Sequence, residues 1–473
     1  MRLLNTTTLA FEEFYDTQQV KYSILSHCWS QDRADPEVTL QAHLSGNYNP
    51  EGQGWKKILR CCALSKELGY EWTWIDTCCI DKSSSAELSE AINSMFKWYQ
   101  DSSECYVFMD DCDGNTLPRV DEFDTDERWK QGMHVSDVAN IEIFSKSRWF
   151  KRGWTLQELL APREVLFYGT TDLLMGTKAE LASLLSYSSG IAQEYLLDSN
   201  AIRTASVAVR MSWASDRTTT RVEDVGYSLL GIFSINMPLL YGEGQKAFQR
   251  LQHEIIRTSV DLSIFAWGIN LEQSEPCSIL ARDPSDFRDS TVSYIALGHL
   301  TDIKAYSITH TGLTVTIYNA MSSDHLSLIL GIIGLDRIVL HMVRHWDNRW
   351  YRDGLQKFTQ PNSERHLLLK TLTKIVTGST RTIHAAIGFH GTSQPIASYG
   401  LDTIEEHKYL RRLRIFVGMI VGALSKLPLM AMFVSQVTVL AVATFGSDGL
   451  VLGLTYVLLA AFGAVYLRGF WAY

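Results

Sequence analysis

The chain lacks the strongly basic surface that nucleic-acid-binding proteins carry. Its 473 residues include 43 Lys and Arg against 52 Asp and Glu, which gives a formal net charge of −9 at pH 7. The one basic cluster is short, at residues 411–414. Because phosphate backbones are bound by clustered positive charge, we expect no nucleic-acid partner.

The sequence also lacks the glycine-rich loops that hold nucleotide phosphates and the cysteine spacings that hold zinc. Without a Walker loop or a Gly-x-Gly-x-x-Gly motif, a nucleoside triphosphatase or a dehydrogenase has no support. His341 and His345 have the spacing of a helical metal pair, but residues 339–342 have the pattern of a strand. On a strand that spacing loses its meaning, so we expect no metal site and no bound cofactor.

The start of the chain lacks the apolar segment of a secretory signal peptide. Eight cysteines are present, seven of them before residue 113. We therefore expect reduced, buried thiols in a cytosolic domain, with disulfides as the alternative. Cys78 and Cys79 are not expected to be nucleophiles, because no histidine pairs with them and their context favours burial.

The first 170 residues alternate strand and helix patterns. The strand patterns are residues 22–28, 72–78, 105–109 and 164–168, and the helix patterns are residues 55–68, 87–99 and 155–161. This order predicts an α/β fold with a mostly parallel sheet and helices on both faces.

Three short blocks place polar or aromatic residues where these strands end. They are residues 22–29 (Tyr-Ser-Ile-Leu-Ser-His-Cys-Trp), 74–81 (Trp-Ile-Asp-Thr-Cys-Cys-Ile-Asp) and 152–159 (Arg-Gly-Trp-Thr-Leu-Gln-Glu-Leu). Because the carboxyl ends of parallel strands form a ligand crevice, the blocks predict one shared site. In this order they resemble the HET (heterokaryon incompatibility) domain of filamentous fungi, over residues 1–170. That domain looks like a divergent TIR domain, so the resemblance implies a TIR-like (flavodoxin-like) sheet.

The resemblance implies that Glu158 is catalytic. In TIR-type NAD hydrolases a glutamate near the start of the helix after the third strand completes the active site, and Glu158 has the corresponding position. NAD would be a substrate, and the carboxylate would stabilise the ribose cation that forms as nicotinamide leaves. The alternative is that Glu158 only stabilises a helix N-terminus. The insertion at 111–137, and Ser30 where relatives commonly have glycine, depart from the pattern.

Ligand contacts are expected from the ends of the first two strands. Ser26 and His27 lie where a polar loop could hold phosphate, and Trp29 could stack on a base or a nicotinamide ring. A purely structural histidine is the alternative for His27. Asp76 is expected to contact ribose, and Asp81 to cap the next helix.

Three further ligand-binding candidates precede Glu158, namely Arg148, Arg152 and Trp154. The two arginines could donate hydrogen bonds to a ligand phosphate or pair with Glu158. Structural ion pairs are the alternative for both.

Beyond residue 170 the pattern changes twice. Residues 171–260 have helical patterns at 178–187, 201–213 and 244–259, and they resemble the extension that often follows a HET domain. Residues 261–400 predict a β-rich, antiparallel domain of unknown role. Its strand patterns are residues 262–267, 306–309, 313–317, 326–333 and 337–342.

Residues 427–447 and 449–467 contain no charged side chain. Each is long enough to cross a hydrocarbon core of ~30 Å at ~1.5 Å per residue. We expect a membrane hairpin within residues 411–473, with Asp448 at its turn. Basic flanking residues would keep both ends, and the HET domain, on the cytosolic side. A buried pair of core helices is the alternative.

The resemblance implies an effector of vegetative incompatibility and programmed cell death, and two hypotheses stay open. In the first, the HET domain hydrolyses NAD when it is clustered. In the second, it signals self/non-self recognition by self-association alone, and Glu158 is structural. Both imply self-association and an incompatibility partner that the sequence does not identify.

Overall fold

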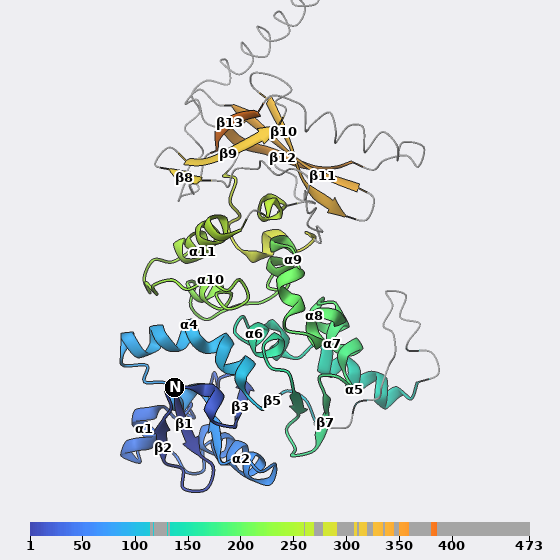
Figure 1. The fold of residues 1–473 in the computed structure, drawn as a ribbon. Coiled ribbons are helices and arrows are strands. Elements are labelled where there is room, and N and C mark those ends of the chain that lie inside the picture. Colours follow the sequence, from blue (N-terminus) through green and yellow to red (C-terminus); the bar gives the residue numbers. More distant parts are fainter. Residues whose placement is uncertain are drawn as a thin grey trace, which may run out of the picture. The chain divides into compact units, whose positions relative to one another are not determined.

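A seven-stranded sheet organises the N-terminal part of the protein (Figure 1). The computed structural model describes residues 1–113, 117, 130, 133–259, 261–268 and 278–290, and the backbone of strands between residues 307 and 385. The strand order is β2-β1-β4-β3-β5-β6-β7. These strands are β1 (Arg2–Asn5), β2 (Phe11–Glu13), β3 (Tyr22–His27), β4 (Trp72–Trp74), β5 (Glu104–Phe108), β6 (Val165–Tyr168) and β7 (Leu174–Thr177).

The four central strands are parallel, as the sequence predicts. Strand β3 pairs with β4 on one side and β5 on the other, and β5 pairs with β6. In chain order this is 2-1-3-4, the order of flavodoxin-like doubly wound sheets. All six residues of β3 are buried, because helices cover both faces of a central parallel strand.

The edges of the sheet are antiparallel, which the sequence does not predict. Strand β1 pairs with β4 and with β2, and β7 pairs with β6. The sheet is therefore mixed. These edge strands have three or four residues each, too few for a period-two pattern to be recognised.

Helices lie on both faces of the sheet. Figure 1 shows α4 (Ser85–Asp101) and α6 (Thr155–Leu160) on one side, and α1 (Leu40–Ser45) and α2 (Gln53–Glu67) on the other. This follows from right-handed crossovers that run in opposite directions along the sheet, α2 connecting β3 to β4 and α4 connecting β4 to β5 on the other side of β3. The helices predicted at 55–68, 87–99 and 155–161 are confirmed to within two residues at each end.

The strand predicted over residues 72–78 is too long. Strand β4 ends at Trp74, and a helical turn, α3 (Asp76–Cys79), follows, with Cys79 N donating to Ile75 O at 2.8 Å. Apolar and cysteine residues suit a buried turn as well as a strand, so periodicity could not separate the two.

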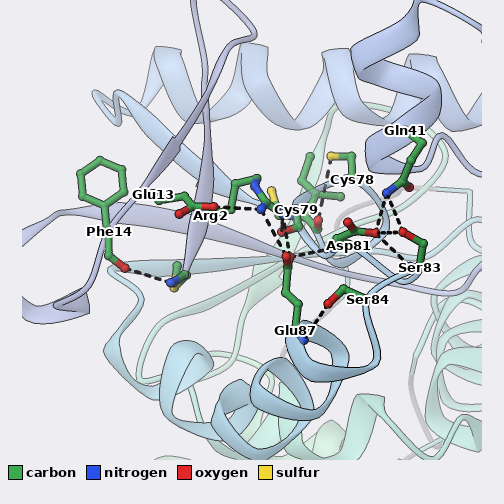
Figure 2. Close-up of polar contacts among 12 residues, drawn as sticks. Arg2, Glu13, Phe14, Gln41, Cys78, Cys79, Asp81, Ser83, Ser84 and Glu87 are labelled. Atoms are coloured by element: carbon green, nitrogen blue, oxygen red, sulfur yellow. Dashed lines mark hydrogen bonds and ion pairs between the residues drawn. The ribbon is translucent and has the colours of Figure 1, made fainter.

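The turn between α3 and α4 corrects a second detail (Figure 2). Ser84, and not Asp81, caps α4 by accepting a hydrogen bond from Glu87 N at 3.3 Å. Asp81 instead accepts from Ser83 N at 2.9 Å within the turn. The Glu87 side chain accepts from Arg2 at 2.6 Å and from Asp81 N at 2.7 Å, which ties β1 to the start of α4.

The extension after β7 is helical but more broken than predicted. Its elements are α7 (Ala182–Ser189), α8 (Gln193–Leu197), η4 (Ala201–Thr204), α9 (Val207–Ser212), α10 (Asp224–Tyr227) and α11 (Lys246–Thr258). The helix predicted over 201–213 is interrupted, since Ser206 caps α9 by accepting from Val209 N at 3.2 Å. The helix predicted over 178–187 starts later, because β7 runs to Thr177.

Strands between residues 307 and 385 form a second, six-stranded sheet of order β10-β11-β12-β13-β9-β8. Its pairs are antiparallel except for β12 with β13, so the predicted β-rich character is confirmed. The strands are β8 (Ser307–Thr309), β9 (Gly312–Tyr318), β10 (His325–Ile333), β11 (Asp336–Arg344), β12 (Trp350–Phe358) and β13 (Thr380–Ala385). The strand predicted at 262–267 is instead a 3₁₀ turn, η5 (Leu262–Phe265).

Within the described residues, no helix has both the length and the apolar character needed to cross a bilayer. The spans predicted at 427–447 and 449–467 lie outside the described residues.

Candidate functional site

Glu158 lies beside the end of β3, at the carboxyl edge of the parallel strands. Every residue of α6 is buried, which fixes the direction in which Glu158 points. Ser26, near the end of β3, donates a hydrogen bond from Oγ to Glu158 Oε2. Trp149 Nε1 donates in turn to Ser26 Oγ at 2.9 Å. The structure therefore brings together Ser26 and Glu158, as the shared-site argument expects.

Burial controls the ionisation of Glu158. The residue is only 7% exposed. Burial raises the pKa of its carboxyl group to about 8, and the negative charge of Asp76 acts in the same direction. The hydrogen bond from Ser26 and the charges of Arg152 and Arg217 oppose the rise. In this state the carboxyl group is mostly protonated at pH 7.

Asp76 is a second carboxyl group, with the opposite shift. Its Oδ1 lies 3.0 Å from His27 Nε2, and its Oδ2 accepts from Trp29 Nε1 at 2.8 Å. Burial raises the pKa of Asp76, but the hydrogen bond from His27 and the charge of Lys82 outweigh it, so the pKa stays below its ordinary value. An ionised and a neutral carboxyl group that influence each other's charge are typical of sites that divide acid and base roles.

Lys57 and Glu37 hold the other side of the His27 ring. Lys57 Nζ lies 2.8 Å from His27 Nδ1 and 2.6 Å from Glu37 Oε1. Burial lowers the pKa of His27, and the charge of Lys57 lowers it further. The imidazole is therefore neutral at pH 7, with Nδ1 accepting from Lys57 and Nε2–H donating to Asp76.

Two cations lie near the indole of Trp29. Lys82 Nζ is 3.6 Å from the ring centroid and the Arg152 guanidinium carbon is 5.4 Å from it. A tryptophan face attracts cations through its π-electrons, so this ring can bind a cationic group of a ligand in place of Lys82.

Two of the predicted ligand-binding residues pair with other side chains in this structure. Arg148 pairs with the half-exposed Asp110, Nε to Oδ1 at 3.0 Å, which is the structural ion pair given as the alternative. Trp154 Nε1 donates to Asp224 Oδ2 at 3.3 Å, in the helical extension. Neither side chain makes a described contact with Ser26, Asp76 or Glu158.

Several members of the cluster were not predicted: Glu37, Lys57, Lys82, Trp149 and Arg217. The sequence could have indicated Lys57, because it lies in the first turns of α2, the helix that connects β3 to β4. Such helices begin at the carboxyl edge of the sheet. Arg217 had none, because it comes from the extension 59 residues after Glu158.

One hollow among the described residues lies apart from this cluster. It has a volume of about 630 Å³ and is lined by residues such as Tyr15, Glu90 and Lys97. No residue of the Glu158 cluster lines it. The Glu158 side chain is itself almost fully buried, so the cluster is closed in this state and a ligand could reach Glu158 only after neighbouring side chains move.

The cysteines around the site are thiols. All seven cysteines in the described part of the chain are free and buried, as predicted. Burial raises the pKa of Cys28 to about 11 and that of Cys61 to about 12. Thiols with such values make poor nucleophiles at neutral pH.

Comparisons with known proteins identify two regions. Residues 22–158 match the family model described as Heterokaryon incompatibility protein (HET), and residues 246–318 match a domain of unknown function, DUF8212. A curated relative, Vegetative incompatibility protein HET-E-1 of Podospora anserina, is 42% identical over 235 residues. That stretch is 50% of this chain and 16% of the relative, so the chain spans a small part of that protein. No solved structure matches the chain.

Proposed function

This chain is a HET-domain protein, with the domain at residues 22–158, and from that premise we propose that it is an effector of heterokaryon incompatibility that hydrolyses NAD at the Glu158 cluster. One observation carries the proposal. A buried glutamate at the carboxyl edge of a parallel sheet receives a hydrogen bond from Ser26, and the negative charge of the ionised Asp76 acts on it.

The reaction needs one well-placed carboxylate. The bond from ribose C1′ to the nicotinamide nitrogen breaks, and its electron pair stays with nicotinamide, which leaves as a neutral molecule. Water adds to the ribosyl cation and releases a proton, so the products are nicotinamide, ADP-ribose and H⁺. In this scheme the Glu158 carboxylate stabilises the cation and then accepts the proton of the attacking water.

The raised pKa of Glu158 suits a site that is inactive until it is occupied. A mostly protonated carboxyl group cannot stabilise a cation. The nicotinamide ring of NAD is itself cationic, and an opposite charge within about 4–6 Å lowers the pKa of an acid. Binding of the substrate would thereby ionise the group that acts on it.

Trp29 and Arg152 would hold the substrate in this proposal. The cationic ring would take the place of Lys82 over the indole, where cation–π attraction favours it. Arg152, on the loop before α6, would donate to a phosphate. The Asp76 carboxylate, which His27 and Trp29 orient, would accept hydrogen bonds from ribose hydroxyls.

We propose further that clustering activates the site. The cluster is closed in the described state, and association of neighbouring chains would supply the energy to open it. A C-terminal membrane anchor on the cytosolic side would raise the local concentration of HET domains. The support for that anchor is the pair of uncharged segments, 427–447 and 449–467.

The second candidate is a non-enzymatic module that signals by self-association. Its support is the closed, hydrogen-bonded state of Glu158, which is also what a structural glutamate would show. In this candidate the chain would cause cell death without consuming NAD.

Expression of the chain in a fungal host distinguishes the two. Enzymatic action predicts that NAD falls before viability is lost, and that Glu158→Gln abolishes both effects. If the wild-type chain kills while NAD stays constant, or if Glu158→Gln kills equally well, the enzymatic proposal is wrong and the signalling module is favoured.

A further inference from the structure

The segment at 217–219, which belongs to the extension and lies outside the HET match, pairs through its backbone with the loop that precedes Glu158. Thr218 N donates to Lys151 O at 2.6 Å, and Gly153 N donates to Thr218 O at 2.8 Å. Arg152 and Thr218 form a parallel β-bridge. The loop that carries Arg152 therefore takes its backbone partners from residues more than 60 positions further along the chain.

Gly153 shows how close this approach is. A Cβ atom at position 153 would lie 2.5 Å from Thr219 Cγ2 and 3.4 Å from Ser228 Oγ. Real Cβ atoms essentially never come that near another heavy atom. Unless the Thr219 side chain moves, only glycine at position 153 lets the segment at 217–219 lie this close to the loop.

Arg217 of this segment connects to Glu158 through a continuous hydrogen-bonded path. Its Nη1 donates to Arg152 O and to Thr155 Oγ1, both at 2.9 Å. Thr155 Oγ1 donates to Trp149 O at 2.5 Å. Trp149 then donates through Nε1 to Ser26, which donates to Glu158.

One end of the Arg217 guanidinium remains unused. Its Nη2 atom is buried and has no hydrogen-bond partner in the described structure. Such a buried donor is costly to leave unpaired. Burial lowers the pKa of Arg217 to about 10 and the charge of Glu158 opposes this, so Arg217 is charged at neutral pH and feels the Glu158 carboxylate.

We propose that Arg217 is a positioning residue for Glu158, so that the segment after the HET domain completes the site. Its charge favours the ionised carboxylate, and Nη2 is the donor available to that carboxylate when it forms. Residues 22–158 alone would hold Glu158 with less positive charge nearby. The idea deepens the proposed function, but the link between Arg217 and Glu158 can be measured without any NAD cleavage.

Other titratable groups near Glu158 are Tyr99, Cys105, Cys28, Asp76 and Arg152. Near neutral pH, burial keeps the first three uncharged, and Asp76 stays ionised. Arg217 is therefore the one member of the described cluster that joins Glu158 from outside the HET match and carries a compensating charge.

The test is the pH dependence of thermal unfolding of the full chain. Glu158→Gln removes one titration, so the difference in melting temperature between this variant and the wild type traces the ionisation of Glu158. We expect the difference to grow from about pH 4.5, where the unfolded chain releases the proton, and to level off above about pH 8, where the folded chain releases it too. In the Arg217→Met background the pH at which the curve levels off should rise by about one unit, the effect of removing a nearby opposite charge.

Two further variants keep the test decisive. Arg221→Met removes a guanidinium four residues further along the chain, whose carbon lies 4.5 Å from the centroid of the Tyr241 ring. This variant should leave the curve in its wild-type position. Arg217→Lys keeps a positive charge and replaces Arg217→Met in the test if that variant does not fold. It should shift the curve by less than Arg217→Met would. An unchanged curve in a folded Arg217 variant would overturn the proposal, as would a curve that moves equally with Arg221→Met. Absence of NAD cleavage would refute the proposed function and leave this titration as it is.

Discussion

At the scale of single residues, the chemistry of the cluster depends on which carboxyl group is ionised. Asp76 has hydrogen-bond donors on both oxygens and lies among cations, whereas Glu158 has the Ser26 hydroxyl and is almost fully buried. The same kind of group therefore has two different charges at neutral pH. Ser26 is the residue through which this balance can be changed with least disturbance.

Ser26→Ala should both destabilise the protein and raise the pKa of Glu158. The hydroxyl donates to Glu158 and accepts from Trp149, so its loss leaves a buried indole N–H without a partner, at about 1–3 kcal/mol. Urea unfolding measures this cost. Ser23→Ala is the control, because Ser23 is also buried in β3 but bonds to Ser65 at 2.7 Å and to Thr73 at 2.9 Å. If the free energy of unfolding depends on pH in the same way in both variants, the role given to Ser26 is contradicted.

The rate of NAD cleavage should rise with pH. If the ionised form of Glu158 acts and its pKa in the free protein is about 8, kcat/KM should increase about tenfold per unit below pH 8 and level off above it. A profile that falls between pH 6 and 8 would mean that the protonated form acts, as a general acid.

The same shift affects stability, with a sign that follows from proton binding. Folding raises the pKa of Glu158 from 4.5 to about 8, so between these values the folded chain holds a proton that the unfolded chain releases. The contribution of Glu158 to stability is therefore full below about pH 4.5 and is lost as pH rises through 8. His27 acts oppositely, since its lowered pKa gives stability that is present above pH 6.5 and lost on acidification.

At the scale of elements, α6 is a short helix held at both ends by other parts of the chain. Its first turn is bound by Arg217 through Thr155. At its other end Lys178 Nζ donates to Leu159 O in the last turn, at 3.3 Å, and to Pro162 O just beyond the helix. A six-residue helix has little stability of its own, so these contacts, together with burial, decide where Glu158 lies.

Gly153→Ala should displace the segment at 217–219 from the loop before α6. The new methyl group would overlap Thr219 Cγ2, and overpacking of this kind costs about 1–3 kcal/mol. Hydrogen exchange of the Gly153 and Thr218 amides, which bond across this contact, should speed up. Gly190→Ala is the control, since position 190 has open space but a φ of +70°. It should destabilise α7 and leave those two amides protected.

The sequence predicts the elements that carry long periodic patterns and misses those fixed by distant contacts. Strands β3 and β5 and helices α2 and α4 are recognisable from apolar runs and amphipathic spacing. The end of β4 is not, because the turn α3 is as buried as a strand. The convergence of Ser26 and Glu158 follows from strand order, whereas the place of Arg217 depends on packing that no local pattern records.

The same limit applies to Arg148 and Trp154. Both flank Glu158 in sequence and were natural candidates for ligand contacts. Arg148 begins the 3₁₀ turn η3 (Arg148–Lys151), and its side chain extends to Asp110, while Trp154 faces the extension. Proximity in sequence does not fix direction within a tight turn, where successive side chains diverge.

At the scale of the whole molecule, the C-terminal part should anchor the protein in a membrane. Residues 427–447 and 449–467 are uncharged and long enough to span a bilayer, and basic residues flank them. Carbonate extraction should leave the full-length chain in the membrane fraction and release a version that ends at residue 398. Equal release of both would mean that these segments are a buried helical pair.

The most direct test of the central claim is nicotinamide release by the purified full-length chain, incubated with NAD at high protein concentration and pH 8. The account predicts steady release by the wild type and by Glu142→Gln, a control on the surface of α5 (Val135–Ser145). Glu158→Gln should be slower by about 10²–10³, the loss expected when electrostatic stabilisation of the transition state is removed. Release by Glu158→Gln at the wild-type rate, or no release by any of the three proteins, would contradict the claim that this cluster hydrolyses NAD.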